Sequence, residues 1–457
     1  MNSRYAWFIV TLIPWLNWSA ATMAQGRSSK QPNVILVYTD DQGSVDVGCY
    51  GATDLITPHM DKLATRGLRW TQFYSAAPVC SPSRAAVLTG RYPQRAGLAG
   101  NAGSKPGSHG MAPDQVTMAE VFKNAGYATG HIGKWHLGYI PETMPNAQGF
   151  DYSFGHMGGC IDNYSHFFYW NGPNRHDLWR NGKEIWADGQ FFPSLMVREA
   201  RQFIDAHQEK PFFLYWAINV PHYPLQGTAA WRKRYQDLEP PRRMYAAFIS
   251  TMDEMIGQLM QHLDQRGLTE NTIIVFQSDH GHSTEERTFG GGGSAGKYRG
   301  AKFSLFEGGI RVPAIISWPG QLPQNQVRGQ MAFSVDWLPT LAELTRVPLP
   351  KRRIDGISLV PMIRSAKAKP PREVFHWQSG RGLGGKPQWA VRSGPWKLIG
   401  NPRDTGNQLP LTARDQLFLA NLEQDPGETQ NLASQHAELT QQLHQLHEKW
   451  LKDVTGQ

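Results

Sequence analysis

The sequence predicts an α/β protein with a large, mostly parallel sheet sandwiched by helices, followed by a small C-terminal α+β subdomain with an antiparallel sheet. Two observations lead to this prediction. Apolar runs of strand length alternate with helical patterns from residue 33 to residue 345, which is typical of parallel sheets covered on both faces. After a stretch of Lys, Ala and Pro at residues 367–371, short strands separated by Gly and Pro follow. That change of pattern indicates antiparallel pairing.

The first predicted strand covers residues 33–39, a continuous apolar run of the kind that forms a buried parallel strand. The first predicted helix comes next. Thr57 and Pro58 have the residue types of an N-cap and a first helical position. Gly67, directly after Arg66, is expected to end this helix.

A second helix is predicted from the capping-box pair Thr117 and Glu120, with Gly126 as its end. The same alternation then continues to the end of the main domain, which we place at residues 31–368. The remaining predicted strands lie at residues 127–132, 212–219, 272–277 and 314–318, and the remaining helices at residues 195–207, 244–266 and 335–345.

The C-terminal subdomain is predicted at residues 372–457. Its final helix covers residues 435–454, where Leu439, Leu443, Leu446 and Trp450 are spaced to line one face. Its strands are predicted at residues 374–378, 389–392, 396–399 and 416–421.

The composition excludes some classes of protein. Among 457 residues, 40% are hydrophobic and 11% aromatic, which is too many for a disordered chain. The formal charge of +8 comes from scattered Lys and Arg, without a zinc-finger or RNA-binding motif. We therefore expect no nucleic-acid partner. A mildly basic protein that acts on anionic substrates fits this charge.

Residues 1–24 are predicted to be a signal peptide. Arg4 supplies a positive charge, residues 6–16 are apolar, and Thr22-Met23-Ala24 offers a cleavage site. The apolar run is shorter than the roughly 20 residues of a membrane-spanning helix. We therefore expect a periplasmic or secreted protein without stable membrane insertion. An uncleaved anchor or an N-terminal core helix is the alternative.

The cysteines are Cys49, Cys80 and Cys160. In an exported protein, an odd number means that at least one thiol is not in an internal disulfide. Cys49 and Cys160 could pair, and the sequence leaves this open.

Acidic residues follow two of the predicted buried strands. Asp40 and Asp41 come after the first strand, and Asp279 and His280 follow the strand at 272–277. Ligands of open α/β sheets bind at the carboxyl ends of the strands, so these side chains are expected to meet. Oxygen-rich sets favour Ca²⁺ or Mg²⁺ over Zn²⁺. The alternative is that the acidic residues are helix caps or turn residues.

Residues 77–91 contain Cys80, Pro82 and Arg84 in the pattern Cys-x-Pro-x-Arg, followed by Leu-Thr-Gly-Arg at residues 88–91. This stretch resembles the signature of the formylglycine-dependent (type I) sulfatases, and a plain buried cysteine is the alternative. The chain most resembles the arylsulfatase B or N-acetylgalactosamine sulfatase branch around residues 149–171 and 245–254. Further similar stretches lie at residues 39–43, 133–138, 221–222, 278–281, 302, 307–313 and 419–432.

The resemblance implies an alkaline-phosphatase-like superfold. It also implies that a separate maturation enzyme oxidises Cys80 to Cα-formylglycine. Arg84 would belong to the sequence pattern that this enzyme recognises. One hydroxyl of the hydrated aldehyde would attack sulfur, and the other would let the aldehyde re-form as sulfate leaves. Many family members have Asn where this chain has His280. The implied Ca²⁺, with Mg²⁺ as the alternative, would be held by Asp40, Asp41, Cys80 in its modified form, Asp279 and His280.

The resemblance also implies roles for further residues. Arg84, Lys134 and Lys302 match cationic positions that contact sulfate or the nucleophile. His136 matches the residue beside the formylglycine and is a candidate base for sulfate expulsion. His222 matches the residue that can protonate the leaving oxygen.

The predicted function is hydrolysis of sulfate esters on a sulfated poly- or oligosaccharide. Two alternatives remain at this point: a phosphonate or phosphate ester hydrolase of the same superfold, and a non-catalytic protein that binds sulfated glycans. The aromatic run at residues 164–170 could either stack on sugar rings or form a buried segment. The identity of the sugar and the position of its sulfate stay open.

Overall fold

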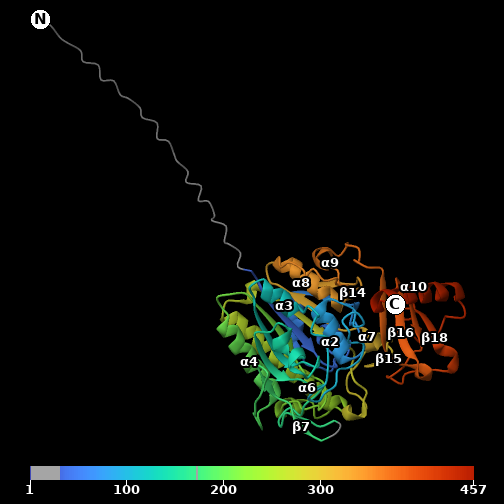
Figure 1. The fold of residues 1–457 in the computed structure, drawn as a ribbon, viewed down its shortest axis with the longest axis horizontal. Helices are drawn as coiled ribbons and strands as arrows, with labels where there is room; N and C mark the ends of the chain where they lie inside the picture. The colour runs from blue at the N-terminus through green and yellow to red at the C-terminus, as the bar shows by residue number, and fades with distance from the viewer. Residues whose placement is uncertain (2–30, 171–172, 457) are drawn as a thin grey trace. The chain divides into compact units, whose positions relative to one another are not determined.

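The computed structural model describes residues 1, 31–170 and 173–456. Apart from Met1, the expected signal peptide lies outside these residues. Among the helices of the described residues, none combines the length and apolar character needed to cross a membrane. A ten-stranded sheet with the order β13-β2-β12-β11-β1-β10-β4-β5-β8-β9 forms the centre of the fold (Figure 1). Its strands are β1 (Asn33–Thr39), β2 (Gly67–Trp70), β4 (Ala128–Lys134), β5 (Tyr152–His156), β8 (Trp179–Arg180), β9 (Lys183–Glu184), β10 (Phe212–Ala217), β11 (Thr272–Ser278), β12 (Ala314–Ser317) and β13 (Gln326–Arg328).

The centre of this sheet is parallel, as the sequence predicts. Strands β11, β1, β10, β4 and β5 are parallel neighbours. Towards the edges, β12 pairs antiparallel with β11 and β2, and β8 pairs antiparallel with β5 and β9. The sequence pattern predicts β12 as an apolar run, but it does not predict β2, β5, β8, β9 or β13, which are short and show no clear apolar run or alternation. The α/β class is confirmed, with a sheet that is mixed at its edges.

Both faces of the sheet are buried under helices. Ile35 and Val37 of β1 belong to the core formed with α1, α4 and α6, whereas Val34 and Leu36 belong to the core formed with α2, α3 and α8. Water is therefore excluded from both faces, and the ends of the strands are the open positions. The helices are α1 (Pro58–Thr65), α2 (Cys80–Thr89), α3 (Met118–Asn124), α4 (Phe192–Ala206), α5 (Ala229–Arg234), α6 (Arg242–Gln265), α7 (Glu307–Ile310), α8 (Trp337–Thr345) and α9 (Val360–Arg364).

Helix α1 begins at Pro58 as predicted, but a tertiary contact caps it. The side chain of Thr57 makes no capping bond. Instead, the Asp253 carboxylate on α6 accepts hydrogen bonds from the backbone N–H groups of His59 (3.1 Å) and Met60 (2.8 Å). The capping box of Thr117 and Glu120 at α3 is present as predicted.

Gly67 has a different role from the expected helix stop. Helix α1 ends at Thr65 and Gly67 is the first residue of β2. A Cβ atom at this position would lie 2.0 Å from the carbonyl oxygen of Ile316 on β12. Glycine is therefore required because the two backbones approach closely.

The C-terminal part forms the predicted antiparallel sheet, with the order β15-β16-β17-β18 (Figure 1, orange and red). Helix α10 (Ala437–Thr455) packs on β16 and β17. The sequence places Leu446 on the buried face of this helix, and this prediction is wrong, because Leu446 is 40% exposed. His447 is buried in its place and stacks on Trp389 at a centroid distance of 4.5 Å. The strands are β15 (Val374–Arg381), β16 (Pro387–Ser393), β17 (Trp396–Gly400) and β18 (Leu417–Asn421).

Shorter elements connect these units. The two-residue strands pair as β3 with β14 and as β6 with β7. They are β3 (Phe73–Tyr74), β6 (Phe167–Phe168), β7 (Arg175–His176) and β14 (Ala332–Phe333), and the 3₁₀ helices are Gly48–Tyr50, Pro141–Thr143, Pro145–Gln148, Thr269–Asn271, Glu286–Thr288, Ser334–Asp336, Leu383–Gly385 and Ala413–Gln416.

Helix α7 and the C-terminal sheet share a buried charged contact. Lys397 on β17 lies 3.0 Å from the Glu307 carboxylate at the start of α7 and 3.1 Å from Glu428. None of the three side chains is exposed. Apolar residues from both parts also form a common core. The boundary between residues 368 and 372 stays a prediction.

The same contact region holds the loop before α7. The hydroxyl of Thr405 donates a hydrogen bond to the carbonyl oxygen of Lys302 (2.8 Å), and the amide of Gln388 donates one to Phe303 (2.6 Å). Arg299 forms an ion pair with Asp404 at 2.8 Å. The loop at residues 299–306 is thus fixed by groups of the C-terminal part.

All three cysteines are free. Cys49 is half-buried and Cys160 is buried, and burial raises the pKa of both thiols to about 12. The pairing that the sequence left open is therefore not formed in this structure.

Two buried histidines of the C-terminal part lead to a prediction about acid stability. Burial lowers the pKa of His376 and of His447 to about 3, compared with about 6.5 in an unfolded chain. The unfolded state therefore takes up protons that the folded state does not, so this stability is present above pH 6.5 and is lost as the pH falls towards 3. At pH 5 the loss should be about 2 kcal/mol per histidine.

We expect His447→Phe, which keeps a ring but removes the titrating group, to flatten this dependence. The free energy of unfolding, measured by urea titration at pH 7.5 and pH 5, should fall less in the variant than in the wild type, by about 2 kcal/mol. His109→Gln, at an exposed position of the main domain, is the control and should behave as the wild type. An identical pH dependence in His447→Phe and the wild type would contradict the assignment.

Candidate active site

The predicted site residues meet at the carboxyl edge of the parallel sheet. The register of β1 and β11 pairs Thr39 with Ser278, so Asp40 and Asp279 leave the sheet side by side. Strand β10 lies next to β1 and β4 lies next to β10, so both end at the same edge, where α2 and the loop before α7 add further side chains. The side chains gathered there are Lys134 and His136 at the end of β4, His222 after β10, Cys80 and Arg84 on α2, and Lys302 in the loop before α7.

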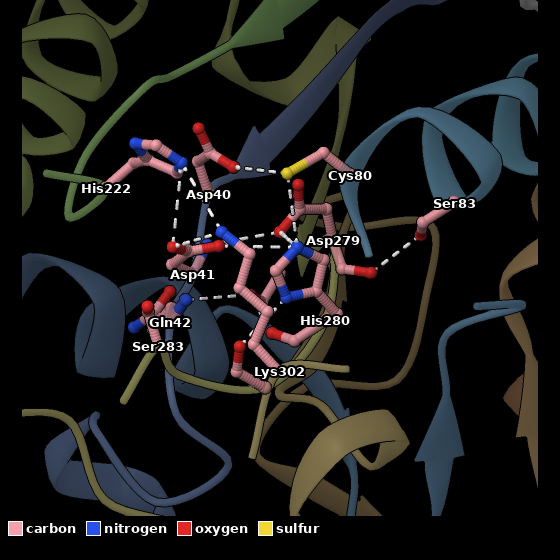
Figure 2. Close-up of polar contacts among 12 residues, drawn as sticks. Asp40, Asp41, Gln42, Cys80, Ser83, His222, Asp279, His280, Ser283 and Lys302 are labelled. Carbon is pink, nitrogen blue, oxygen red and sulfur yellow. Dashed lines mark hydrogen bonds and ion pairs between the residues drawn. The ribbon is translucent and has the colours of Figure 1, made fainter. Parts of the chain in front are cut away.

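Cys80 is the first residue of α2. Its Sγ lies 3.3 Å from Lys134 Nζ. The same Sγ lies 3.4 Å from His280 Nε2 (Figure 2). Burial alone would raise the pKa of this thiol, but Lys134, Lys302 and His280 hold it well below its usual value. The helix N-terminus favours a negative charge as well. This position is thus built to hold an anionic group.

Asp40 anchors the cations around Cys80. Its carboxylate is fully buried and lies 2.7 Å from Lys134 Nζ and 3.2 Å from Arg84. Burial would raise the pKa of Asp40, but Lys134, His222 and Arg84 together keep the pKa well below its usual range. Arg84 also binds Asp279 at 2.9 Å and so joins the two strand ends.

Asp41 lies between the cationic and the acidic groups. Its backbone is left-handed (φ 63°), which is strained for a residue other than glycine. One carboxylate oxygen binds Lys302 Nζ at 2.9 Å. The other, Oδ1, is buried, has no hydrogen-bond partner, and lies 3.3 Å from His280 Nε2. This unpaired oxygen is available to a ligand.

The acidic cluster fits a divalent cation. One ligand atom from each of Asp40, Asp41, Cys80 and His280 lies within 4.8 Å of the others. Asp279 lies beside them, with Oδ1 3.5 Å from His280 Nε2. Burial raises the pKa of Asp279 to about 7, and Asp40 adds repulsion. A cation would relieve this crowding of buried carboxylates, and its preference for oxygen would match the unpaired Asp41 oxygen.

Two histidines face the site from the other side. The Nδ1–H group of His222 donates to the carbonyl oxygen of Tyr223 (3.0 Å), which leaves Nε2 directed at Lys302 Nζ (3.5 Å). His136 is buried and its Nε2 lies 3.4 Å from the Ser104 hydroxyl. Burial lowers the pKa of His136, so its ring is neutral at physiological pH and can accept a proton.

A cavity of about 630 Å³ opens above Cys80. The Arg287 guanidinium on its wall lies 3.1 Å from the ring centroid of Trp170 and 4.5 Å from that of Tyr223. Glu285 binds both Arg287 (2.5 Å) and Lys302 (3.1 Å). Lys302 and Arg287 lower the pKa of Glu285 to about 2, against the effect of burial.

Sequence reasoning misses Glu285 and Arg287, because they lie in a loop without a periodic pattern or a motif. Their closeness in the chain to Asp279 and His280 is the single available signal. The aromatic run at residues 164–170 is divided between the cavity wall and the protein interior. Phe168 and Trp170 line the cavity, whereas His166 is buried away from it.

An α/β sheet whose edge gathers buried cations and carboxylates around a helix N-terminus defines an enzyme that acts on tetrahedral anions. Comparison with known families makes the class specific. Residues 32–347 match the family described as Sulfatase, and residues 298–454 match the family described as N-sulphoglucosamine sulphohydrolase, C-terminal. The chain belongs to the sulfatase family and is a sulfuric-ester hydrolase.

Individual relatives agree with this assignment. Arylsulfatase A from Homo sapiens is 35% identical, over 92% of this chain and 87% of the relative. N-acetylgalactosamine-6-O-sulfatase from Bacteroides thetaiotaomicron is 32% identical, over 92% of this chain and 93% of the relative. The solved structure of Ps i-CgsB in complex with k-i-k-neocarrahexaose superposes with a TM-score of 0.81 at 30% identity, covering 92% of this chain and 93% of that one. The sulfatase resemblance read from the sequence is confirmed.

Proposed function

We propose that this enzyme removes sulfate from a sulfated carbohydrate, with Cys80 converted to Cα-formylglycine and a Ca²⁺ ion beside it. The observation that carries the proposal is the environment of Cys80. The residue lies at a helix N-terminus, next to Lys134 and within 4.8 Å of ligand atoms from Asp40, Asp41 and His280. A structural cysteine needs neither the cations nor the carboxylates.

A separate maturation enzyme would produce the formylglycine from Cys80. This chain would be exported, with residues 1–24 as the signal peptide. The hydrated aldehyde supplies one hydroxyl that is nucleophilic towards sulfur and a second through which sulfate can be released. The Ca²⁺ would be held by Asp40, Asp41, the modified residue 80, Asp279 and His280, and it supplies positive charge against sulfate oxygens. Mg²⁺ is the alternative ion.

The remaining side chains bind sulfate and move protons. Lys134 keeps its charge through Asp40 and, together with Arg84, balances negative charge at position 80. Lys302 is held by Asp41 and Glu285, and it can donate to a sulfate oxygen above the site. His222, when protonated, presents Nε2–H to the leaving oxygen. Neutral His136 accepts the proton of the second, non-attacking hydroxyl as the aldehyde re-forms and sulfate leaves.

The cavity supports a sulfated carbohydrate as the substrate. Lys105, Arg175 and Arg287 line its wall and provide positive charge for further anionic groups of a sugar chain. Trp170 is 45% exposed and offers an apolar ring to a sugar face. The names of the N-acetylgalactosamine-6-O-sulfatase and of the neocarrahexaose complex point in the same direction. Parallel assays with sugar sulfates, an aryl sulfate and an aryl phosphate test the proposal, and turnover of the phosphate alone would overturn it.

Cys80→Ala and Cys80→Ser should both abolish turnover, because neither residue can form an aldehyde. Peptide mass spectrometry of active enzyme should show the mass loss expected when CH₂SH becomes CHO at position 80. Cys49→Ser, remote from the cavity, is the control and should keep its activity. Full activity of a sample in which Cys80 is uniformly unmodified would contradict the mechanism.

Asp279→Asn should weaken Ca²⁺ binding and reduce activity severely. In the wild type, Ca²⁺ added after chelation should raise the Tm, because ligand binding to the folded state stabilises it. This rise should be small or absent in Asp279→Asn and unchanged in the surface control Asp114→Asn. Active enzyme without stoichiometric Ca²⁺ or Mg²⁺ by elemental analysis would rule the ion out.

His222→Ala should impair sugar sulfates far more than nitrophenyl sulfate, because a sugar alkoxide needs a proton as it leaves. The difference should approach the roughly 10²–10⁴-fold contribution of general acid catalysis. His136→Ala should lower kcat for both substrates alike, since release of sulfate does not depend on the alcohol that has left. Equal losses of kcat/KM for the two substrates in His222→Ala would show that His222 binds sulfate instead.

A further inference from the structure

A second cluster of potential metal ligands lies outside the site at Cys80. His166 directly precedes β6, His176 is the last residue of β7, and Asp188 follows β9. One ligand atom from each of the three lies within 4.8 Å of the other two. His166 is fully buried and His176 is 7% exposed, whereas Asp188 is exposed. The cluster is thus enclosed by protein on one side and accessible to an ion through Asp188 on the other.

Each of the two imidazoles has one nitrogen held and one nitrogen free. His166 Nε2–H donates to the backbone carbonyl of Gln190 (3.0 Å), and His176 Nδ1–H donates to the Glu184 carboxylate (2.9 Å). Their other nitrogens, His166 Nδ1 and His176 Nε2, are buried without a hydrogen-bond partner. Metal-binding histidines typically donate their second N–H to a carboxylate or a backbone carbonyl, which fixes the tautomer.

The donor set indicates the kind of metal. Two imidazole nitrogens and one carboxylate suit Zn²⁺ and similar transition-metal ions, whereas Ca²⁺ and Mg²⁺ prefer sets made of oxygen atoms. The Trp186 ring stacks on His176 at 3.9 Å with an interplanar angle of 9°, so it shields one face of that ligand. A water molecule can complete a tetrahedral site.

We propose that His166 Nδ1, His176 Nε2 and the Asp188 carboxylate bind a transition-metal dication, Zn²⁺ foremost, that is distinct from the ion beside Cys80. The metal joins both strands of the β6–β7 ribbon to the loop after β9. Phe168 and Arg175 of this ribbon line the cavity above Cys80. The site therefore has a structural role in fixing one wall of the substrate cavity.

Metal content measured on the full-length protein tests the proposal. After chelation, protein incubated with excess Ca²⁺ and one equivalent of Zn²⁺ should retain one Zn²⁺ per chain through gel filtration. Asp188→Asn, which changes an exposed side chain and should not affect folding, should lose this Zn²⁺. Glu184→Gln should weaken Zn²⁺ binding by about 10–100-fold, as expected when the partner of a ligand histidine is removed.

The reciprocal control separates the two metal sites. Asp40→Asn should retain Zn²⁺, because the cluster at His166 does not include Asp40. Co²⁺ in place of Zn²⁺ should give visible absorption bands of a tetrahedral site in the wild type and in Asp40→Asn, and these bands should be lost in His176→Gln. If Zn²⁺ is retained equally by the wild type and Asp188→Asn, or is lost in Asp40→Asn protein whose circular dichroism matches that of the wild type, the proposal is wrong.

The role of the metal has its own readout. Chelation followed by Ca²⁺ alone should raise KM for a sugar sulfate and leave kcat almost unchanged, because the ribbon contacts substrate and not the reacting atoms. Zn²⁺ should restore KM in the wild type but not in Asp188→Asn. An effect confined to kcat would overturn the structural role. The metal content and the Co²⁺ spectrum do not depend on turnover, so they remain informative even if the proposed sulfatase substrate is wrong.

Discussion

The buried charges at the carboxyl edge of the sheet can exist only as a set. Asp40, Asp41 and Asp279 are almost completely buried, and so are Arg84, Lys134 and Lys302, which contact them. A buried charge that loses its partner costs about 3–5 kcal/mol, so none of these side chains can change alone without penalty. This mutual dependence keeps the cations charged and close to Cys80. It also explains why so many polar groups can occupy the interior of the protein.

The sheet makes this set possible. Parallel neighbours deliver the ends of β1, β11, β10 and β4 to one edge, while helices on both faces keep water away from the strands. The backbone is left-handed at Asp41 (φ 63°) and His136 (φ 55°), where the chain must turn sharply directly after a strand. Strain of this kind is tolerated where the surrounding structure holds the residue in place. Here the buried ion pairs and the rigid strands provide that restraint.

The sequence predicts an element correctly where its local pattern of apolar and polar residues matches the burial that the fold imposes. Strands β1 and β11 have continuous apolar centres, because both of their faces are buried, and the site residues follow them directly. Short edge strands such as β8 show no pattern. The buried face of α10 includes His447, which hydrophobic periodicity treats as polar. Glu285 and Arg287 reach the cavity because of the conformation of their loop, which the sequence does not reveal. The spacing of His166, His176 and Asp188 matches no familiar metal motif. These features depend on contacts between segments distant in the chain.

The loop at residues 299–306 carries Lys302, yet groups beyond residue 387 hold it in place. Thr405 and Gln388 bind its backbone, and Lys397 neutralises Glu307 just after it. The C-terminal part is therefore scaffolding for the reaction centre and not an independent module. In evolution it cannot be exchanged freely between relatives, because a foreign C-terminal part would have to supply the same contacts. Chimeric enzymes built from this family would need a junction before residue 299, so that the loop and its supports are inherited together.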